Sequence, residues 1–144
     1  VIKFGTMLKS RDCIMGWDDI FLVLVRNYLI YFNNEQEFNL FLNDINNGNE
    51  LKGLYKGSIK LDDNSFAMNY ATFNDFPEFV VRTKDFPKGY CFLCCNAGLD
   101  QVVNTLENTS WIRAINSTID NMKITYATGI KIAISNSNQI QHLN

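Results

Sequence analysis

The sequence lacks several features that would assign it directly to a functional class. It contains no apolar run of about 18 residues, which argues against a membrane-spanning helix. The formal net charge is only −2, so overall charge predicts neither nucleic-acid binding nor membrane attraction. There is no glycine-rich phosphate loop, and the single histidine, His142, has no plausible catalytic partners nearby in the sequence. We therefore expect a non-enzymatic chain with no catalytic residues, no cofactor and no nucleic-acid partner.

Cysteine is scarce and unevenly placed. Three of the four cysteines, Cys91, Cys94 and Cys95, crowd into one expected strand, which is poor geometry for a disulfide framework. The spacing of Cys91 and Cys94 matches half of a zinc site, but a second pair of ligands is missing. We expect reduced thiols in a cytosolic protein and no metal, with zinc as the alternative.

The composition indicates an ordered globular chain. Hydrophobic residues make up 47% and charged residues 19% of the sequence. A length of 144 residues suits one domain with a substantial core. Because the chain begins at Val1 rather than Met, we expect it to be part of a longer protein.

Short β-rich runs dominate the first hundred residues. The link Arg26-Asn27 is a candidate two-residue hairpin turn. Seven such runs at this spacing predict an antiparallel sandwich or barrel. The expected strands cover residues 2–9, 17–25, 28–32, 54–61, 66–73, 78–84 and 90–95.

The segment 33–50 breaks this pattern. Phe38, Phe41, Leu42 and Ile45 fall at helical spacing, which predicts a short amphipathic helix between the third and fourth strands. This 35–45 insertion has two possible roles. It covers an edge or end of the barrel, or it contacts a protein partner or a membrane through Phe38 and Phe41.

A helix is expected near the C-terminus. Trp111, Ile112, Ile115, Ile119 and Met122 form one apolar stripe, which we expect to plug the open end of the barrel. The alternative for Trp111 is an exposed anchor. The apolar residues between 102 and 106 fall on another side of a straight helix, so we expect a break between residues 104 and 110.

The remaining tail is ambiguous. Ile130, Ile132 and Ile134 alternate like a strand around Gly129, and residues 135–144 are polar enough to be disordered. We place the domain at residues 1–122, and we expect 123–144 to be an extension that is partly disordered or forms a short added element.

The order of these segments resembles the pleckstrin homology (PH) domain. That family has seven strands in two sheets, followed by one helix that contains a tryptophan. The resemblance covers roughly residues 1–122. It rests on residues 5–9 (GTMLK), 17–24 (WDDIFLVL), 29–32 (LIYF), 56–61 (KGSIKL), 90–94 (YCFLC) and 111–115 (WIRAI).

The resemblance implies a mostly β fold: a seven-stranded antiparallel sandwich or barrel, capped by one C-terminal helix, here with an extra short helix in the third–fourth strand loop. It also implies binding of a phospholipid headgroup at the open end of the barrel. The residues expected there are Lys9, Arg11, Lys56, Lys84 and Lys88, because basic side chains bind phosphate through charge-assisted hydrogen bonds. The alternative is that these are ordinary solvated charges.

The sequence departs from the family at one important place. Phosphoinositide-binding members carry a basic pair in the second strand, where this chain has Asp18 and Ile20. Losing a cation and adding an acid predicts weak binding of polyphosphorylated inositols. A phosphomonoester such as phosphatidic acid fits the remaining bases better.

Two aromatic residues lie near the expected rim. Phe86, between Lys84 and Lys88, is a candidate for membrane contact, or it belongs to a turn packed on itself. Trp17 either packs inside the barrel or inserts into a membrane. Paired acids at 18–19 and 62–63 are expected to be solvated in turns rather than to form an acid/base pair.

Together these features predict a cytoplasmic, peripherally membrane-associated module. It would bind anionic phospholipid, phosphatidic acid or weakly phosphoinositides, and need a second membrane signal such as acylation outside these residues. The family includes an acylated member that senses phosphatidic acid in secretion. The alternative function is a protein-interaction scaffold of the PH type that binds no lipid.

Overall fold

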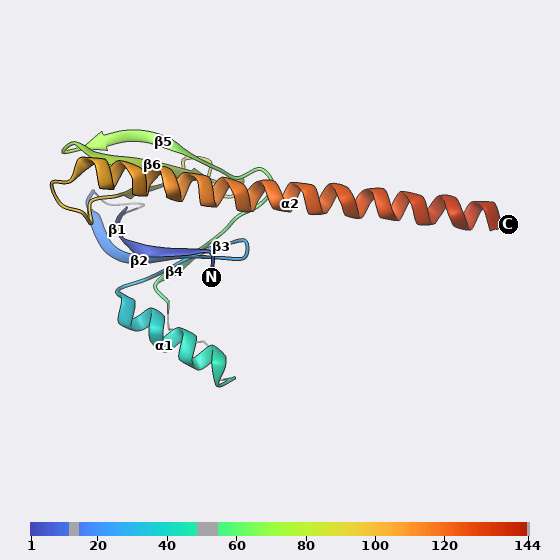
Figure 1. Ribbon diagram of the computed structural model, residues 1–144, viewed down its shortest axis with the longest axis horizontal. Coiled ribbons are helices and arrows are strands. Elements are labelled where there is room, and N and C mark those ends of the chain that lie inside the picture. Colours follow the sequence, from blue (N-terminus) through green and yellow to red (C-terminus); the bar gives the residue numbers. More distant parts are fainter. Residues whose placement is uncertain (12–14, 49–54, 144) are drawn as a thin grey trace.

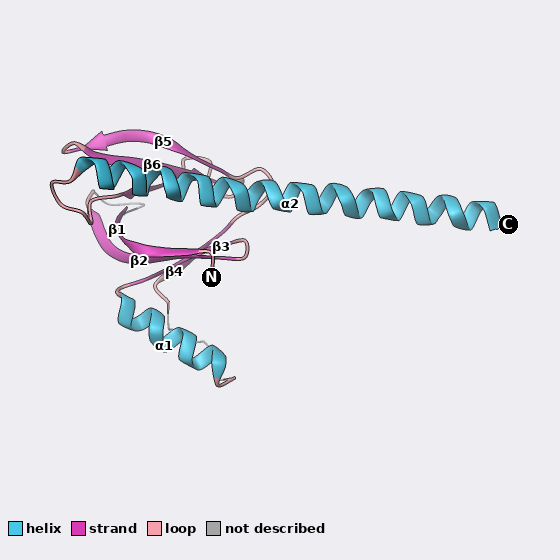
Figure 2. Cartoon of the chain, in the orientation of Figure 1, coloured by secondary structure: helices cyan, strands magenta, loops and turns pink. Residues whose placement is uncertain are grey.

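The computed structural model describes residues 1–11, 15–48 and 55–143. These form one antiparallel sheet of seven strands, in the spatial order β4-β3-β2-β1-β7-β6-β5, together with two helices (Figures 1 and 2). In chain order the elements are β1 (Lys3–Ser10), β2 (Trp17–Val25), β3 (Tyr28–Phe32), α1 (Glu35–Asn46), β4 (Gly57–Lys60), β5 (Phe66–Phe73), β6 (Phe76–Arg82), β7 (Tyr90–Leu93) and α2 (Gln101–Leu143).

Tight turns set the register of the sheet. Val25 pairs with Tyr28 across the predicted link at Arg26, which adopts a positive φ of 52°. The β5–β6 turn places both Asn74 and Asp75 at positive φ, the backbone conformation that matches the twist of a two-residue hairpin. Within the curled sheet, β1 is the central strand and pairs with both β2 and β7. The predicted seven-stranded antiparallel fold with one extra helix is confirmed.

The main core lies between the curled sheet and the first half of α2 (Figure 1). Trp111 is fully buried, and Ile115 and Ile119 follow it on the same side of the helix. They pack against residues from both halves of the sheet, including Leu24 and Phe79. Burial of such apolar surface is the principal force that holds the helix on the sheet.

Helix α1 covers the outside of the sheet and builds a second, smaller core. Phe38 and Phe41 pack against Phe21, Val23 and Phe32. The two helix residues are only 5% and 8% exposed. This excludes the alternative role, partner or membrane contact through Phe38 and Phe41, because those rings are already used to cover the sheet.

Helix α2 differs from the expectation at both ends. It starts at Gln101 and runs without the expected break at 104–110, because Val102 and Leu106 are exposed rather than packed. The Asp100 carboxylate accepts a hydrogen bond from the Val103 N–H at 3.2 Å and so caps the start of the helix.

The strand-like alternation around Gly129, where the sequence was ambiguous, does not form a strand. Residues 130–134 continue α2, which extends to Leu143 and projects beyond the sheet (Figure 1). Alternating isoleucines form a strand only where a neighbouring strand can pair with them, whereas a helix already begun adds residues by local hydrogen bonds. No helix in the described part of the chain combines the length and apolarity needed to cross a membrane.

The other strand limits shift by a few residues. Strand β6 begins and ends two residues before its expected limits of 78 and 84, and β7 ends at Leu93 rather than Cys95. The Thr83 hydroxyl accepts a hydrogen bond from the Phe86 N–H at 3.1 Å, and this turn ends β6 early. Part of the expected strand 54–61 lies outside the described residues, and β4 covers Gly57–Lys60.

Candidate functional site

Two bases from different segments meet at one acid. The Arg11 Nε lies 2.9 Å from Asp18 Oδ1, and the Lys56 Nζ lies 3.6 Å from Asp18 Oδ2. Arg11 follows β1, Asp18 lies in β2 and Lys56 precedes β4. The hydrogen bond from Arg11 is the main reason that the pKa of Asp18 lies below its usual value, with the charge of Lys56 adding to it. The acid that departs from the family pattern is thus the counter-ion of two of the bases.

Lys9 lies opposite Asp18 across β1 and β2. It is 6% exposed, and its ammonium lies 5.2 Å from the centre of the Tyr31 ring and 5.7 Å from that of Tyr90. It also donates a hydrogen bond to the Ser10 carbonyl at 3.2 Å. Contact with two aromatic faces lowers the cost of burying a cation. Lys9 therefore contributes positive charge from inside the rim rather than from its surface.

Gly57 makes this arrangement possible. It pairs with Tyr31 across β3 and β4, and a β-carbon at this position would collide with the Tyr31 ring. Without that side chain, the ring lies over the start of β4 and stays close to Lys9. The glycine that follows Lys56 was visible in the sequence. That it makes room for the Tyr31 ring follows only from the register of β3 and β4.

Lys88 reaches the same region from the β6–β7 loop, residues 83–89. It lines a cavity of about 120 Å³ with Arg11, Ser10, Tyr70, Phe86, Gly89 and Cys91. Gly89 has a φ of +95°, and a β-carbon there would collide with Val80, so the loop folds directly onto β6. We call Lys9, Arg11, Lys56 and Lys88 the basic rim.

Lys84 is not part of that group. It lines a different cavity together with Arg82, Asn64, Phe66 and Pro87. The five bases expected at one site are thus divided between two places. Sequence reasoning missed Arg82, because it was assigned to the interior of a strand.

The two rim aromatics pack against protein neighbours. The Phe86 ring centre lies 4.6 Å from that of Tyr90, so its half-buried side chain folds back onto β7 as part of a packed turn. The half-buried Trp17 lies 5.5 Å from Phe73 and outside the main core, contrary to its expected place inside the barrel.

The cysteines in the described residues are free thiols. Burial raises the pKa of Cys91 to about 11 and that of Cys94 to about 12, so both are protonated at neutral pH. The described residues contain no group of three or more acidic, cysteine or histidine side chains arranged to hold a metal ion. Cys13 lies outside the described residues.

Several PH domains of known structure share this architecture. The PH domain of human oxysterol-binding protein-related protein 11 matches with a TM-score of 0.57 and 18% identity, over 85% of this chain and 83% of that one. The carboxyl-terminal PH domain of pleckstrin matches with a TM-score of 0.53 and 22% identity, over 82% and 96%.

A second structure of the pleckstrin domain, in complex with D-myo-Ins(1,2,3,4,5)P5, matches with a TM-score of 0.50 and 23% identity, over 81% and 96%. No model of a sequence family matches the chain. No curated protein matches it in sequence either. The shared strand order, the capping helix with its buried Trp111 and these structural matches establish that the chain has the pleckstrin homology fold.

Proposed function

We propose that this PH-fold chain is a non-catalytic module that binds the headgroup of an anionic phospholipid through the basic rim. The observation that carries the proposal is that Arg11 and Lys56 converge on the two oxygens of one carboxylate. A pair of cations that holds a carboxylate in this way also suits a phosphate oxygen. The pleckstrin domain that shares this fold has been solved with inositol pentakisphosphates.

The ligand we favour carries one phosphomonoester, as phosphatidic acid does, with phosphoinositides as weaker ligands. Asp18 already neutralises part of the charge of Arg11 and Lys56, so the rim has few cations left for a polyphosphate. A phosphomonoester carries about −1.5 to −2 charges at pH 7, which suits a small number of bases. Such binding would place the protein peripherally on a cytoplasmic membrane surface, with a second signal outside these residues.

Vesicle sedimentation tests this proposal. Phosphatidylcholine vesicles with and without phosphatidic acid or phosphoinositide would be compared for the wild type and for Lys56→Gln with Lys88→Gln. We expect at least about tenfold weaker binding for the double variant, since each base near an anionic surface contributes about 1 kcal/mol. Lys9 is unsuitable for this test, because changing a buried side chain would perturb the fold.

Arg113→Gln with Lys123→Gln is the matched control. Both side chains are exposed on α2, so this variant loses the same charge away from the rim. Equal losses for the two double variants would show nonspecific attraction and contradict the proposal. Failure of the wild type to bind any anionic vesicle at low salt would also contradict it.

One observation favours a protein-interaction scaffold as the alternative. Helix α1 exposes Leu40, on the side away from its packed phenylalanines, and Ile45, near its C-terminal end. These residues, rather than Phe38 and Phe41, would form the contact in the 35–45 insertion. Under this alternative, Leu40→Ser would weaken capture of the partner and leave vesicle binding unchanged.

A further inference from the structure

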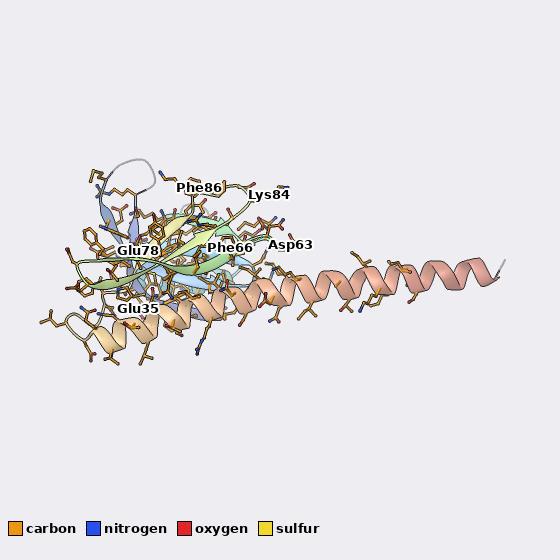
Figure 3. The ribbon with its side chains drawn as sticks, turned by 90° about the horizontal axis from the view of Figure 1, so that it is seen from above. Glu35, Asp63, Phe66, Glu78, Lys84 and Phe86 are labelled. Carbon is orange, nitrogen blue, oxygen red and sulfur yellow. The ribbon has the colours of Figure 1, made fainter. Side chains whose placement is uncertain are left out.

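The β6–β7 loop carries a lysine on each of its two sides. Lys88 lines the 120 Å³ cavity with Arg11, whereas Lys84 lines a separate cavity of about 440 Å³ with Arg82. We call the second one the flank cavity. Its other lining residues are Asn64, Phe66, Thr83 and Pro87. Phe66 begins β5 and Lys84 lies in the loop, so two segments distant in sequence form its walls (Figure 3).

Arg82 lines this cavity and carries a buried guanidinium nitrogen. It ends β6 directly opposite Phe66, which places both residues on the same side of the sheet. Its Nε is buried and has no hydrogen-bond partner among the described residues. A buried donor without a partner is costly and uncommon in folded proteins. An anionic oxygen in the cavity would satisfy that donor.

The rest of the lining fits the same kind of ligand. The described lining residues include two cations and no acid, although Asp63 and Asp85 are close in sequence. Asn64 adds a side-chain amide, while the Thr83 hydroxyl already accepts a hydrogen bond from Phe86. Phe66 is 44% exposed, and with Pro87 it gives the cavity an apolar wall.

We infer that the flank cavity is a second anion site, distinct from the basic rim, which takes a phosphomonoester. The charge of such a group at neutral pH, about −1.5 to −2, matches one guanidinium and one ammonium. The volume lies within the usual range for small-molecule sites. The apolar wall receives the carbon chain that bears the phosphate.

The phosphomonoester belongs to a lipid headgroup or to a soluble metabolite, and the two share this chemistry. If it belongs to a lipid, the loop holds two headgroups of one membrane, one on each side. The second would then bind at the high effective concentration that the first creates.

A titration with glycerol 3-phosphate tests the site without a membrane. Two-dimensional ¹H–¹⁵N NMR of the whole chain would follow the backbone amides of Asn64, Thr83 and Lys84, and the side-chain Nε–H of Arg82. We expect saturable shifts at these four positions. We expect Lys84→Gln to weaken them about fivefold, the upper range for one exposed ion pair, and Arg82→Gln to abolish them.

Controls keep this result specific. Lys123→Gln and Arg113→Gln remove the same charges from exposed positions on α2 and should leave the shifts unchanged. Lys84 is exposed, so Lys84→Gln keeps the fold even if Arg82→Gln does not. Absence of saturable shifts in the wild type, or shifts that survive Lys84→Gln undiminished, would overturn the inference.

Vesicles containing phosphatidic acid identify the source of the phosphate. A loss of about fivefold with Lys84→Gln but not with Lys123→Gln assigns the flank cavity to a lipid headgroup. Unchanged vesicle binding, together with weakened glycerol 3-phosphate binding, assigns it to a soluble phosphomonoester. The rim variant Lys56→Gln with Lys88→Gln should leave the glycerol 3-phosphate shifts at the flank cavity in place. The proposals for the basic rim and for the flank cavity can therefore be confirmed or contradicted separately.

Discussion

Asp18 is the residue that most changes how the basic rim is understood. From sequence alone it was an unfavourable acid among expected cations. In the structure its two oxygens contact Arg11 and Lys56 and hold these bases toward each other. The carboxylate therefore competes with an incoming phosphate for the same donors. Its effect on affinity is that of an internal counter-ion, which a ligand must displace.

Replacing Asp18 tests this competition. We expect Asp18→Asn to bind vesicles containing phosphatidic acid about five- to tenfold more tightly, because Arg11 and Lys56 lose their internal partner. Affinity would be measured by sedimentation at fixed salt. Asp19→Asn is the matched control, since Asp19 is exposed, adjacent and makes the same change of charge. An equal gain in both variants would mean that only total charge matters.

Glu78 provides a second test at the residue scale. It alternates with the core residues Phe79 and Val81 and so lies on the outer face of β6, yet it is only 7% exposed. Burial raises the pKa of the Glu78 carboxyl, and its hydrogen bond with Cys91 opposes the rise only in part. The folded state therefore holds the Glu78 proton to a higher pH than the unfolded chain does.

The sign of the resulting pH dependence follows from this shift. The favourable contribution of protonated Glu78 is fully present below the unfolded pKa, about 4.3, and is lost as pH rises through the folded pKa. Glu78→Gln does not titrate, so we expect its melting temperature to exceed that of the wild type by roughly 2–4 °C at pH 7. At pH 4 the gap should close. A gap independent of pH, or the same gain in the exposed variant Glu35→Gln, would contradict this prediction.

At the level of elements, sequence periodicity predicted most of the fold. Apolar and aromatic runs gave β2, β3 and β5 their observed limits, because turn residues interrupt the sequence at the end of each run. The basic rim was harder to predict. The contact between Lys9, Tyr31 and Tyr90 joins three strands, and the separation of Lys84 from Lys88 depends on how the loop folds over Val80. Neither follows from spacing along the chain.

Helix α1 shows how local polar contacts fix an inserted element. The Asn34 side chain accepts a hydrogen bond from the Glu37 N–H at 2.9 Å, and the Glu37 carboxylate accepts one from the Asn33 N–H at 3.0 Å. This arrangement is close to a capping box. The bonds from Asn33 hold the pKa of Glu37 below its usual value. The helix start is thereby set where Phe38 faces the sheet.

The attachment of α2 to β5 makes a separate prediction. The Asn116 side chain accepts a hydrogen bond from the Ala67 N–H at 2.8 Å and donates one to the Ala67 carbonyl at 2.9 Å. It thus satisfies two backbone groups on the edge strand. We expect Asn116→Ala to lower the free energy of unfolding by about 1–3 kcal/mol, measured by urea denaturation. Asn121→Ala, exposed on the same helix, should cost much less. Equal losses would show that helix propensity, not the β5 contact, is responsible.

At the scale of the whole molecule, helix α2 packs on the curled sheet and then extends beyond it (Figure 1). Met122 is the last residue of α2 found to pack against the main core, and Ile124 is already 62% exposed. Further along, Ile130, Ile132 and Ile134 are exposed as well. An isolated helix gains little stability without tertiary contacts. We therefore propose that the folded domain ends at residue 122.

Truncation tests that boundary. We expect a chain that ends at Met122 to keep the melting temperature of the full chain within about 2 °C, because it retains Trp111, Ile115 and Ile119. A chain that ends at Thr118 loses Ile119 and Met122, and burial of such side chains is worth about 1.5–3 kcal/mol each. It should therefore melt at a clearly lower temperature. Circular dichroism at 222 nm would follow both transitions. If the chain that ends at Met122 also melts at a lower temperature than the full chain, residues beyond 122 stabilise the fold, and the domain includes them.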